Sequence, residues 1–276
     1  MSSKEIGIVE TREILKTIEE VHNYDFKDYA LTSIKYRLER LMEYHNFGNT
    51  EVLISRLRSE KDFFEVFLRD IAVGSTEMFR DPSLWRVLRD DFFPPMLENT
   101  DQFKIWLPIN VSGEELYTLT IILHELGYLD KVEIIATYLS DYSLERIKHG
   151  TLSQKRVDVS AENYKRYHGK GQFNDYYIIK NNEVIRDTSL IKSVKFIKQN
   201  IIFDNSPTDV RLILFRNQLI YYNQTMVDKI LRIMSEALVP GGYFIIGDKE
   251  YVAENKTITD FTIVSNNESI YKKKFM

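Results

Sequence analysis

The chain contains no cysteine, which excludes disulfide bonds, thiolate zinc sites and a cysteine nucleophile. It also lacks any apolar run near the ~20 residues needed to cross a bilayer. The N-terminus lacks the apolar stretch of a signal peptide. We therefore expect a cytoplasmic protein without membrane insertion.

The chain also lacks a strong excess of either charge, because the formal net charge is −4 over 276 residues. Such a balance gives no reason to expect nucleic acid or an anionic membrane as a partner. The five histidines are scattered without the spacing of metal ligands, so no metal site is predicted. An apolar fraction of 43% with 28% charged residues is typical of a soluble globular protein.

The first part of the chain is predicted to be helical throughout, because residues 5–72 contain no proline and few glycines. Apolar residues recur there at three- and four-residue intervals, for example at Ile14 and Ile18. The pattern indicates a small helical bundle that serves in packing or docking. It changes just before Gly74, so we expect domains at 1–73 and 74–276.

From that boundary strands and helices alternate along the chain. The buried runs "FKIWLPI", "KVEIIATYL", "DVRLILF" and "YFIIGD" predict strands, and residues 114–126 predict a helix. This alternation predicts an α/β fold with a doubly wound, mostly parallel, Rossmann-like sheet. Two extended runs around "SNNE" add a hairpin at the C-terminal end.

Residues 160–200 interrupt this alternation and predict a small antiparallel β insertion, rich in Tyr, Ile and Val with an Asn-Asn turn. Residues 142–200 carry 12 Lys or Arg and 6 Asp or Glu, a local balance of +6. One interpretation is a solvated basic face, and the other is a docking face for an acidic partner.

Ligands of a doubly wound sheet bind beyond the carboxyl ends of its strands, so the residues there are candidates for a site. Ser112, Gly113, Glu114 and Glu115 follow the first strand. Glycine lets a ligand approach the backbone, and the two carboxylates can bind a cation or ribose hydroxyls. Alternatively, the helix dipole alone favours acidic residues in a first turn.

Further candidates follow the other strands. Tyr138 ends the second strand, where nucleoside-binding folds usually place an acid for the ribose. Arg80 precedes the first helix of this domain and can direct a guanidinium at an anionic substrate. The remaining candidates are Asn200, Ile201, Arg216, Asn217 and Tyr221.

With these residues in view, the chain resembles the chemotaxis-receptor glutamate methyltransferases, the CheR type. The similarity covers nearly the whole length and is most specific in "STEMFRDPSLW", "SGEELYTLTIILHE", "ENYKRY..GKGQFNDYY" and "LFRNQLIYYN". It implies an N-terminal helical domain, an S-adenosylmethionine-binding α/β domain with a small antiparallel insertion, and methyl transfer to receptor glutamates. An acidic protein, such as a chemoreceptor, would be the substrate or partner; the oligomeric state stays open.

The resemblance also implies roles for individual residues. The positions that match Arg80 and Tyr221 lie at the methyl-transfer centre of the family and help to position the acceptor carboxylate. All the matched positions are Thr76, Arg80, Glu114, Glu115, Asn200, Arg216, Asn217 and Tyr221. Such a reaction needs alignment and exclusion of water more than it needs a general base.

The sequence departs from the family pattern on the cofactor side. Family members generally have a small-residue loop such as A-G-C-S-T-G-E-E, where this chain has Pro108, Ile109, Asn110 and Val111 before Ser112. Gly74 replaces an expected asparagine, and Tyr138 replaces the ribose aspartate. These changes identify the chain as a divergent member with an altered S-adenosylmethionine site.

The altered cofactor site leaves two functions open. A hydrogen bond to a charged group contributes about 1.5–3 kcal/mol, so loss of the ribose acid alone would lower the affinity for the cofactor by one to three orders of magnitude. The first function is an active S-adenosylmethionine-dependent protein-glutamate O-methyltransferase. The alternative is a non-catalytic pseudo-methyltransferase that acts as a protein-binding or signalling module.

The N-terminal region has a slightly acidic balance. Residues 1–72 carry 11 basic and 14 acidic residues, or a net charge of −3, so attraction to an acidic receptor would be weak.

Overall fold

The computed structural model describes residues 5–27, 29–72, 77–98, 100, 103–109, 111–250, 252 and 256–275. The chain divides into two compact units, one of Met1–Val73 with Gln218–Lys229 and one of Gly74–Asn217 with Ile230–Met276. The predicted boundary at residue 74 lies outside the described residues and stays a prediction. Within the described part of the chain, no helix is long and apolar enough to cross a membrane.

The first unit is helical, which confirms the all-helical N-terminal fold. Its helices are α1 (Ile8–His22), α2 (Leu31–Tyr44), α3 (Thr50–Ser59) and α4 (Lys61–Ile71). The apolar residues that recur at helical spacing form its core, where Ile14, Ile18 and Leu38 are fully buried. The amide of Asn49 begins α3 by accepting a hydrogen bond from the Val52 N–H.

The short 3₁₀ turn η5 (Leu219–Tyr221) also belongs to this unit, although the sequence suggested that it completes the second domain. The Ala30 N–H donates to the Tyr221 carbonyl at 3.0 Å. Tyr29 and Tyr222 form an antiparallel bridge, with ring centroids 4.9 Å apart. Such pairing between distant segments leaves no trace in local periodicity.

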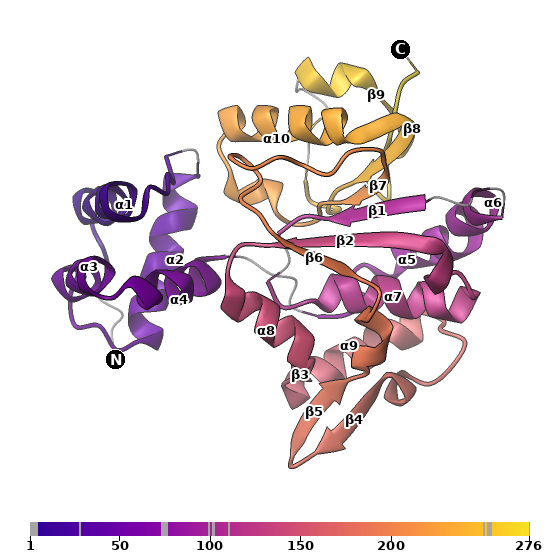
Figure 1. Ribbon diagram of the computed structural model, residues 1–276, viewed down its shortest axis with the longest axis horizontal. Helices are drawn as coiled ribbons and strands as arrows, with labels where there is room; N and C mark the ends of the chain where they lie inside the picture. The colour runs from indigo at the N-terminus through magenta and orange to yellow at the C-terminus, as the bar shows by residue number, and fades with distance from the viewer. Residues whose placement is uncertain are drawn as a thin grey trace. The chain divides into compact units, whose positions relative to one another are not determined.

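The second unit is built on a seven-stranded sheet (Figure 1). Its strands are β1 (Phe103–Leu107), β2 (Val132–Tyr138), β6 (Lys195–Lys198), β7 (Val210–Leu214), β8 (Leu238–Ile245), β9 (Phe261–Ser265) and β10 (Ile270–Lys273). They lie in the order β6-β2-β1-β7-β8-β10-β9, and the first five are parallel. The mostly parallel α/β fold is thereby confirmed. The order reverses between β1 and β7, where ligands of such sheets bind.

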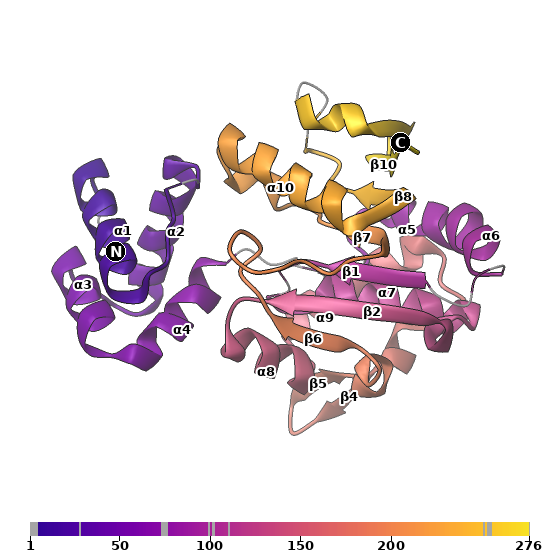
Figure 2. The same cartoon turned by 45° about the horizontal axis from the view of Figure 1, so that its top comes forward.

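Helices cover both faces of this sheet. The helical elements in this part of the chain are α5 (Pro82–Val87), the π-turn η1 (Leu88–Phe92), α6 (Phe93–Leu97), α7 (Glu114–Leu126), α8 (Asp141–His149), α9 (Gln154–Tyr167) and α10 (Gln224–Ala237), with 3₁₀ turns η2 (Leu129–Lys131), η3 (Phe173–Tyr176), η4 (Thr188–Ile191) and η6 (Lys256–Asp260). Helices α7, α8 and α9 lie on one face and α10 lies on the other (Figures 1 and 2). Leu119 and Ile122 of α7 are fully buried in the core on its side of the sheet.

The second, smaller sheet is antiparallel, in the order β3-β5-β4. Its strands are β3 (Thr151–Leu152), β4 (Tyr177–Lys180) and β5 (Glu183–Arg186). It begins before the predicted range of 160–200, and β6 within that range joins the main sheet, parallel to β2. A four-residue edge strand with lysine at both ends carries no local pattern that tells which sheet it joins.

One half-buried carboxylate fastens α9 and η3 to α7. Glu125 of α7 accepts hydrogen bonds from the hydroxyls of Tyr164, Tyr167 and Tyr176, the last two at 3.3 and 2.9 Å. The Gly171 N–H in turn donates to the Tyr164 hydroxyl at 3.1 Å. The aromatic and glycine-rich stretch "ENYKRY..GKGQFNDYY" therefore anchors the insertion to the helix that begins after β1.

Candidate functional site

Arg80 lies in a loop with an unusual backbone. The residues on either side of it, Phe79 and Asp81, have φ of 54° and 57°. The left-handed region costs a non-glycine residue about 1–2 kcal/mol, and such conformations persist only where the surroundings hold them. Backbone strain of this kind is found most often at functional sites, so Arg80 is a candidate functional residue.

The surroundings that hold this loop come from α7 and α9. The Met78 N–H donates to the Ser160 hydroxyl at 3.1 Å, and the Met78 carbonyl accepts from the Asn163 amide at 3.1 Å. The Phe79 N–H donates to the Thr118 hydroxyl at 2.9 Å. These bonds are buried, and each replaces a backbone partner that the tight loop cannot supply.

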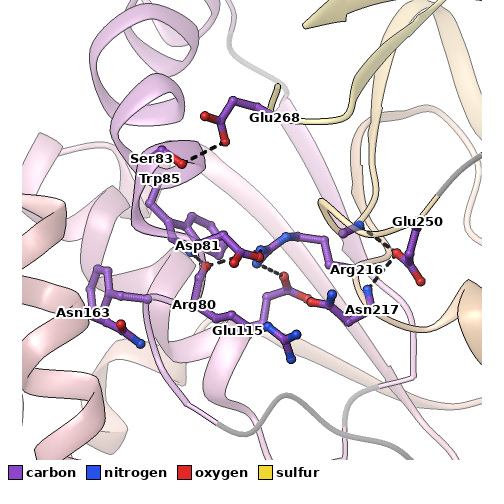
Figure 3. Close-up of polar contacts among 12 residues, drawn as sticks. Arg80, Asp81, Ser83, Trp85, Glu115, Asn163, Arg216, Asn217, Glu250 and Glu268 are labelled. Carbon is purple, nitrogen blue, oxygen red and sulfur yellow. Dashed lines mark hydrogen bonds and ion pairs between the residues drawn. The ribbon is translucent and has the colours of Figure 1, made fainter. Parts of the chain in front are cut away.

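Arg216, which follows β7, connects this loop to the first turn of α7 (Figure 3). Its guanidinium pairs with the Asp81 carboxylate at 2.5 Å and with the Glu115 carboxylate at 2.9 Å. It also donates to the Arg80 carbonyl at 3.2 Å, and the Trp85 indole N–H donates to the same oxygen at 2.8 Å. The side chain of Arg216 is 4% exposed, whereas the carboxylates of Asp81 and Glu115 are 26% and 18% exposed, so a buried cation lies between two half-buried acids.

Burial raises the pKa of Glu115 above its usual range, and the neighbouring Arg216 guanidinium partly opposes that shift. Glu114, which is 1% exposed, pairs with Arg156 at 2.6 Å and accepts a short hydrogen bond from the Ser112 hydroxyl. Both carboxylates predicted to meet a cation or a ribose therefore already have cationic partners within the protein. Among the described residues, no group of three or more metal-ligating side chains is found.

The loop after β1 packs its apolar side chains inward. Ile109 and Val111 are 6% and 9% exposed, and the Ile109 N–H donates to the Thr137 hydroxyl at 3.3 Å. Ile109 has a φ of 54°, which is an outlier for a β-branched residue. Gly113 has a φ of 82° and a Cβ there would lie 3.2 Å from Ile147, so this position needs glycine. Asn110 lies outside the described residues.

Arg186 of β5 ties the small sheet to that loop. It donates to the Ser112 carbonyl at 2.9 Å and to the Gly150 carbonyl at 3.0 Å, and its guanidinium lies 4.1 Å above the Tyr117 ring. Burial lowers its pKa. The sequence gave no indication of this role, because Arg186 is one of twelve basic residues between 142 and 200.

Asn217 is held by a second carboxylate that sequence reasoning missed. Glu250, which is 5% exposed, accepts from the N–H of Asn217 at 2.8 Å and from the N–H of Gly247 at 2.7 Å (Figure 3). A Cβ on Gly247 would lie 2.4 Å from the side-chain nitrogen of Asn217. The acid lies in a loop, where one carboxylate among many carries no periodic pattern.

The other predicted residues lie at the ends of β2 and β6. Tyr138 is 8% exposed, and its carbonyl accepts from the Gln199 N–H at 2.9 Å. Asn200 uses its side-chain oxygen within its own turn, where it accepts from the Ile202 N–H at 3.1 Å, and Ile201 is 4% exposed. Thr76 lies outside the described residues, and Tyr221 belongs to the helical unit.

A cavity of about 630 Å³ opens beside Arg80 in the second unit. That size suits a small ligand or a few side chains of a peptide. Its charged lining residues include Arg80, Asp81, Arg86, Arg166, Lys249 and Glu268. The Glu268 carboxylate accepts from the Ser83 hydroxyl at 3.2 Å, and burial raises its pKa.

The mostly parallel sheet, its change of direction between β1 and β7 and the glycine turn after β1 define a Rossmann-like α/β domain. The family model described as "CheR methyltransferase, SAM binding domain" matches residues 74–268. The model described as "CheR methyltransferase, all-alpha domain" matches residues 10–72. The chain belongs to the CheR methyltransferase family, and the predicted resemblance is confirmed.

Individual relatives agree with the family. Methyltransferase Cher3 of Pseudomonas putida is 29% identical over 273 residues, which are 99% of this chain and 100% of that protein. Chemotaxis protein methyltransferase 1 of Vibrio cholerae is 30% identical and covers 74% of each chain. Chemotaxis protein methyltransferase 1 of Pseudomonas aeruginosa is 28% identical, with 81% of this chain and 82% of that protein covered.

Proposed function

We propose that this protein is an S-adenosylmethionine-dependent methyltransferase that esterifies glutamate side chains of an acidic protein, with a chemoreceptor as the candidate acceptor. Membership of the CheR family supports the reaction class. The observation that carries the proposal is the strained Arg80 loop, which Arg216 ties to Glu115 at the start of α7.

The residues after β1 fit the cofactor in two respects. Gly113 gives the left-handed turn with φ of 82° that begins α7 directly after the loop following β1. Beside Ser112, the Arg186 Nη1 group is buried and has no hydrogen-bond partner, which leaves a donor suited to the carboxylate of the cofactor. We expect the cofactor to be held by Ser112, Gly113, Glu115, Asn200 and Asn217. It would supply a methyl group activated by the positive charge on its sulfur.

The acceptor glutamate is ionised at neutral pH, so its attack needs no general base. Bound S-adenosylmethionine would supply an activated methyl group, and a carboxylate oxygen of the acceptor would receive it as a methyl ester. In this proposal Arg80 pairs with the acceptor carboxylate and Tyr221 fixes its orientation, because alignment in a water-poor site supplies most of the acceleration.

The first experiment is a thermal-shift titration with S-adenosylhomocysteine. At ~100 times its dissociation constant a ligand adds ~2.7 kcal/mol of stability, or about 5–10 °C for a protein of this size. The Arg80→Met variant is compared with the parent protein, since it should still bind S-adenosylhomocysteine but no longer transfer the methyl group. Transfer is measured with radiolabelled S-adenosylmethionine and a chemoreceptor cytoplasmic fragment, as base-labile radioactivity released as methanol.

A flat response at millimolar S-adenosylhomocysteine would overturn the proposal and leave the non-catalytic module. The Tyr138→Asp variant then separates two causes of weak binding. An added ribose acid should strengthen affinity roughly tenfold to a hundredfold if ribose recognition is the missing contact. No gain would locate the obstruction in the loop of Ile109 and Val111.

A further inference from the structure

Trp85 of α5 gives its one hydrogen-bond donor to the main chain of Arg80. The indole is 1% exposed, and its N–H donates to the Arg80 carbonyl at 2.8 Å (Figure 3). Helical side chains lean back toward the N-terminus of their helix, and α5 begins at Pro82, so the indole can reach the residue that precedes the helix by two positions. Because an indole has one donor and no acceptor, this bond uses its whole polar capacity.

The Arg80 carbonyl has a second donor, but that donor is shared. The Nη2 group of Arg216 donates to this carbonyl at 3.2 Å and also to the Asp81 carboxylate at 2.5 Å. Its Nη1 group pairs with Glu115 at 2.9 Å. The guanidinium carbon of Arg216 lies 5.3 Å from the centroid of the Trp85 ring. Trp85 is therefore the dedicated donor to the Arg80 carbonyl, and its ring packs against the cation that supplies the other bond.

The carbonyl that Trp85 holds belongs to the peptide unit between Arg80 and Asp81. The backbone before this unit is held through the N–H groups of Met78 and Phe79 by hydroxyls of α9 and α7. Asp81 has a φ of 57°, a conformation that persists in a non-glycine residue only where neighbouring groups hold it. The bond from Trp85 acts on this unit, and so on the direction in which the Arg80 side chain leaves the backbone.

A buried tryptophan needs an acceptor for its N–H in any case, and Trp106 of β1 shows the ordinary solution. Trp106 is fully buried, and its N–H donates to the Thr137 hydroxyl at 3.4 Å within the sheet. The acceptor of Trp85 lies instead in a strained loop, next to a side chain that lines a cavity. Arg80 is 31% exposed there, in the cavity of about 630 Å³. The two tryptophans are thus a matched pair for experiment.

We propose that Trp85 is a positioning residue for Arg80, because its indole N–H fixes the peptide unit from which the guanidinium is directed toward the acceptor carboxylate. The inference rests on the proposed role of Arg80. A neutral hydrogen bond typically favours the bonded arrangement by a factor of about five. Misplacement of a catalytic group by about 1 Å can cost roughly a hundredfold in rate. Trp85 is buried, so it acts on methyl transfer through Arg80.

The peptide unit can be observed without cofactor or acceptor. Carbonyl-labelled arginine (carbon-13) combined with nitrogen-15 aspartate gives one nuclear magnetic resonance signal for each Arg-Asp pair, and the sequence has four, at 69–70, 80–81, 89–90 and 186–187. The 80–81 signal is identified by its loss in Arg80→Met. In Trp85→Phe it should shift in the carbonyl dimension while the other three stay in place. Trp106→Phe is the control and should leave all four in place; an unshifted 80–81 signal in Trp85→Phe would overturn the proposal.

An isosteric replacement separates the hydrogen bond from the packing of the ring, and serves if Trp85→Phe does not fold. Trp106→Phe leaves Trp85 as the sole tryptophan, so growth of a tryptophan auxotroph on benzothienylalanine replaces that N–H by sulfur. The 80–81 signal should shift relative to the Trp106→Phe protein grown on tryptophan. If it does not, the ring of Trp85 only fills space, and the positioning role is refuted.

The kinetic consequence is measured against the same control. Trp85→Phe should lower kcat for the chemoreceptor fragment about five- to a hundredfold relative to Trp106→Phe, with the affinity for S-adenosylhomocysteine unchanged. In the Arg80→Met background the same substitution should have little further effect on the residual rate, because the side chain that it positions is gone. A full additive loss there, or a parallel loss of affinity, would make Trp85 a general structural residue and contradict the proposal.

The two proposals fail in different ways. If the parent protein shows no thermal shift with S-adenosylhomocysteine, the proposed function falls, and the 80–81 signal still decides whether Trp85 holds the peptide unit after Arg80. If the thermal shift is present and kcat of Trp85→Phe equals that of Trp106→Phe, the methyltransferase stands and the positioning role falls.

Discussion

The two units each bury an arginine, and the two arginines are partnered in opposite ways. Arg216 of the second unit has two carboxylate partners, Asp81 and Glu115, and donates to a backbone carbonyl as well. Arg37 of the first unit stacks on a tyrosine ring and donates to one carbonyl, with no carboxylate partner among the residues described. One charge is more than neutralised, and the other is left uncompensated.

The contrast separates two uses of a buried cation. A buried guanidinium that joins two half-buried carboxylates from distant segments acts as a cross-link, because removing it leaves two neighbouring charges of like sign. A guanidinium without a counter-charge stabilises little, since the desolvation cost offsets its stacking. Arg216 is therefore expected to contribute much to stability, and Arg37 little.

The largest expected effect comes from Arg216→Met. Loss of the cation from a buried network should destabilise the second unit by about 3–5 kcal/mol. Urea unfolding followed by tryptophan fluorescence reports this unit, because Trp85 and Trp106 both lie in it. Arg211→Met, at an exposed position on the same strand, is the control, and a loss below about 1 kcal/mol would contradict the cross-link.

A smaller effect is expected from Asp81→Asn. The amide oxygen can still accept one hydrogen bond from Arg216, and Glu115 still supplies a counter-charge, so about 1–2 kcal/mol should be lost. The same fluorescence-detected unfolding measures it. A loss as large as that of Arg216→Met would show that Asp81 alone carries the network.

Arg37→Met should change the stability of the helical unit by no more than about 1 kcal/mol, because lost stacking and relieved desolvation oppose each other. Thermal unfolding followed by far-ultraviolet circular dichroism measures it. A loss comparable to that of Arg216→Met would mean that Arg37 is also a structural cross-link, and the contrast between the two units would disappear.

The smallest effect concerns pH. Burial raises the pKa of Glu115 above its ordinary value of 4.5, so the native state holds this proton more tightly than the unfolded chain. Stability from this group is present below pH 4.5 and declines as the pH rises through the raised pKa. Unfolding free energies of the parent and of Glu115→Gln, measured across that window, should differ by an amount that depends on pH. Glu51→Gln on α3 is the control, and a constant difference for Glu115→Gln would contradict the shift.

The fold could be predicted from the sequence because its determinants are local. Buried apolar runs gave the strands, helical spacing gave the bundle, and the helix over residues 114–126 has the bounds that were predicted. The helix ends are also set by local residues, since Pro82 begins α5 and Gly150 ends α8 in the left-handed conformation.

The site could be predicted only in part. Its residue types were found at strand ends, but their partners were not, because Arg216 and Asp81 are separated by 135 residues and Glu115 and Arg216 by 101. Nothing in the local pattern distinguished Arg186 or Glu250 from exposed charges. The left-handed backbone on both sides of Arg80 was also hidden, because neither Phe79 nor Asp81 is the glycine that normally marks such a turn.

The attachment of the insertion at Glu125 should be insensitive to ionic strength. Its donors are phenols, and burial together with the hydrogen bond to Glu125 raises the pKa of Tyr176 to about 12, so the donor is uncharged in neutral solution. Dissolved salt screens attractions between exposed charges and has little effect on hydrogen bonds from neutral donors. An acidic partner bound to the basic surface of the insertion should therefore be released by salt that leaves the insertion itself in place.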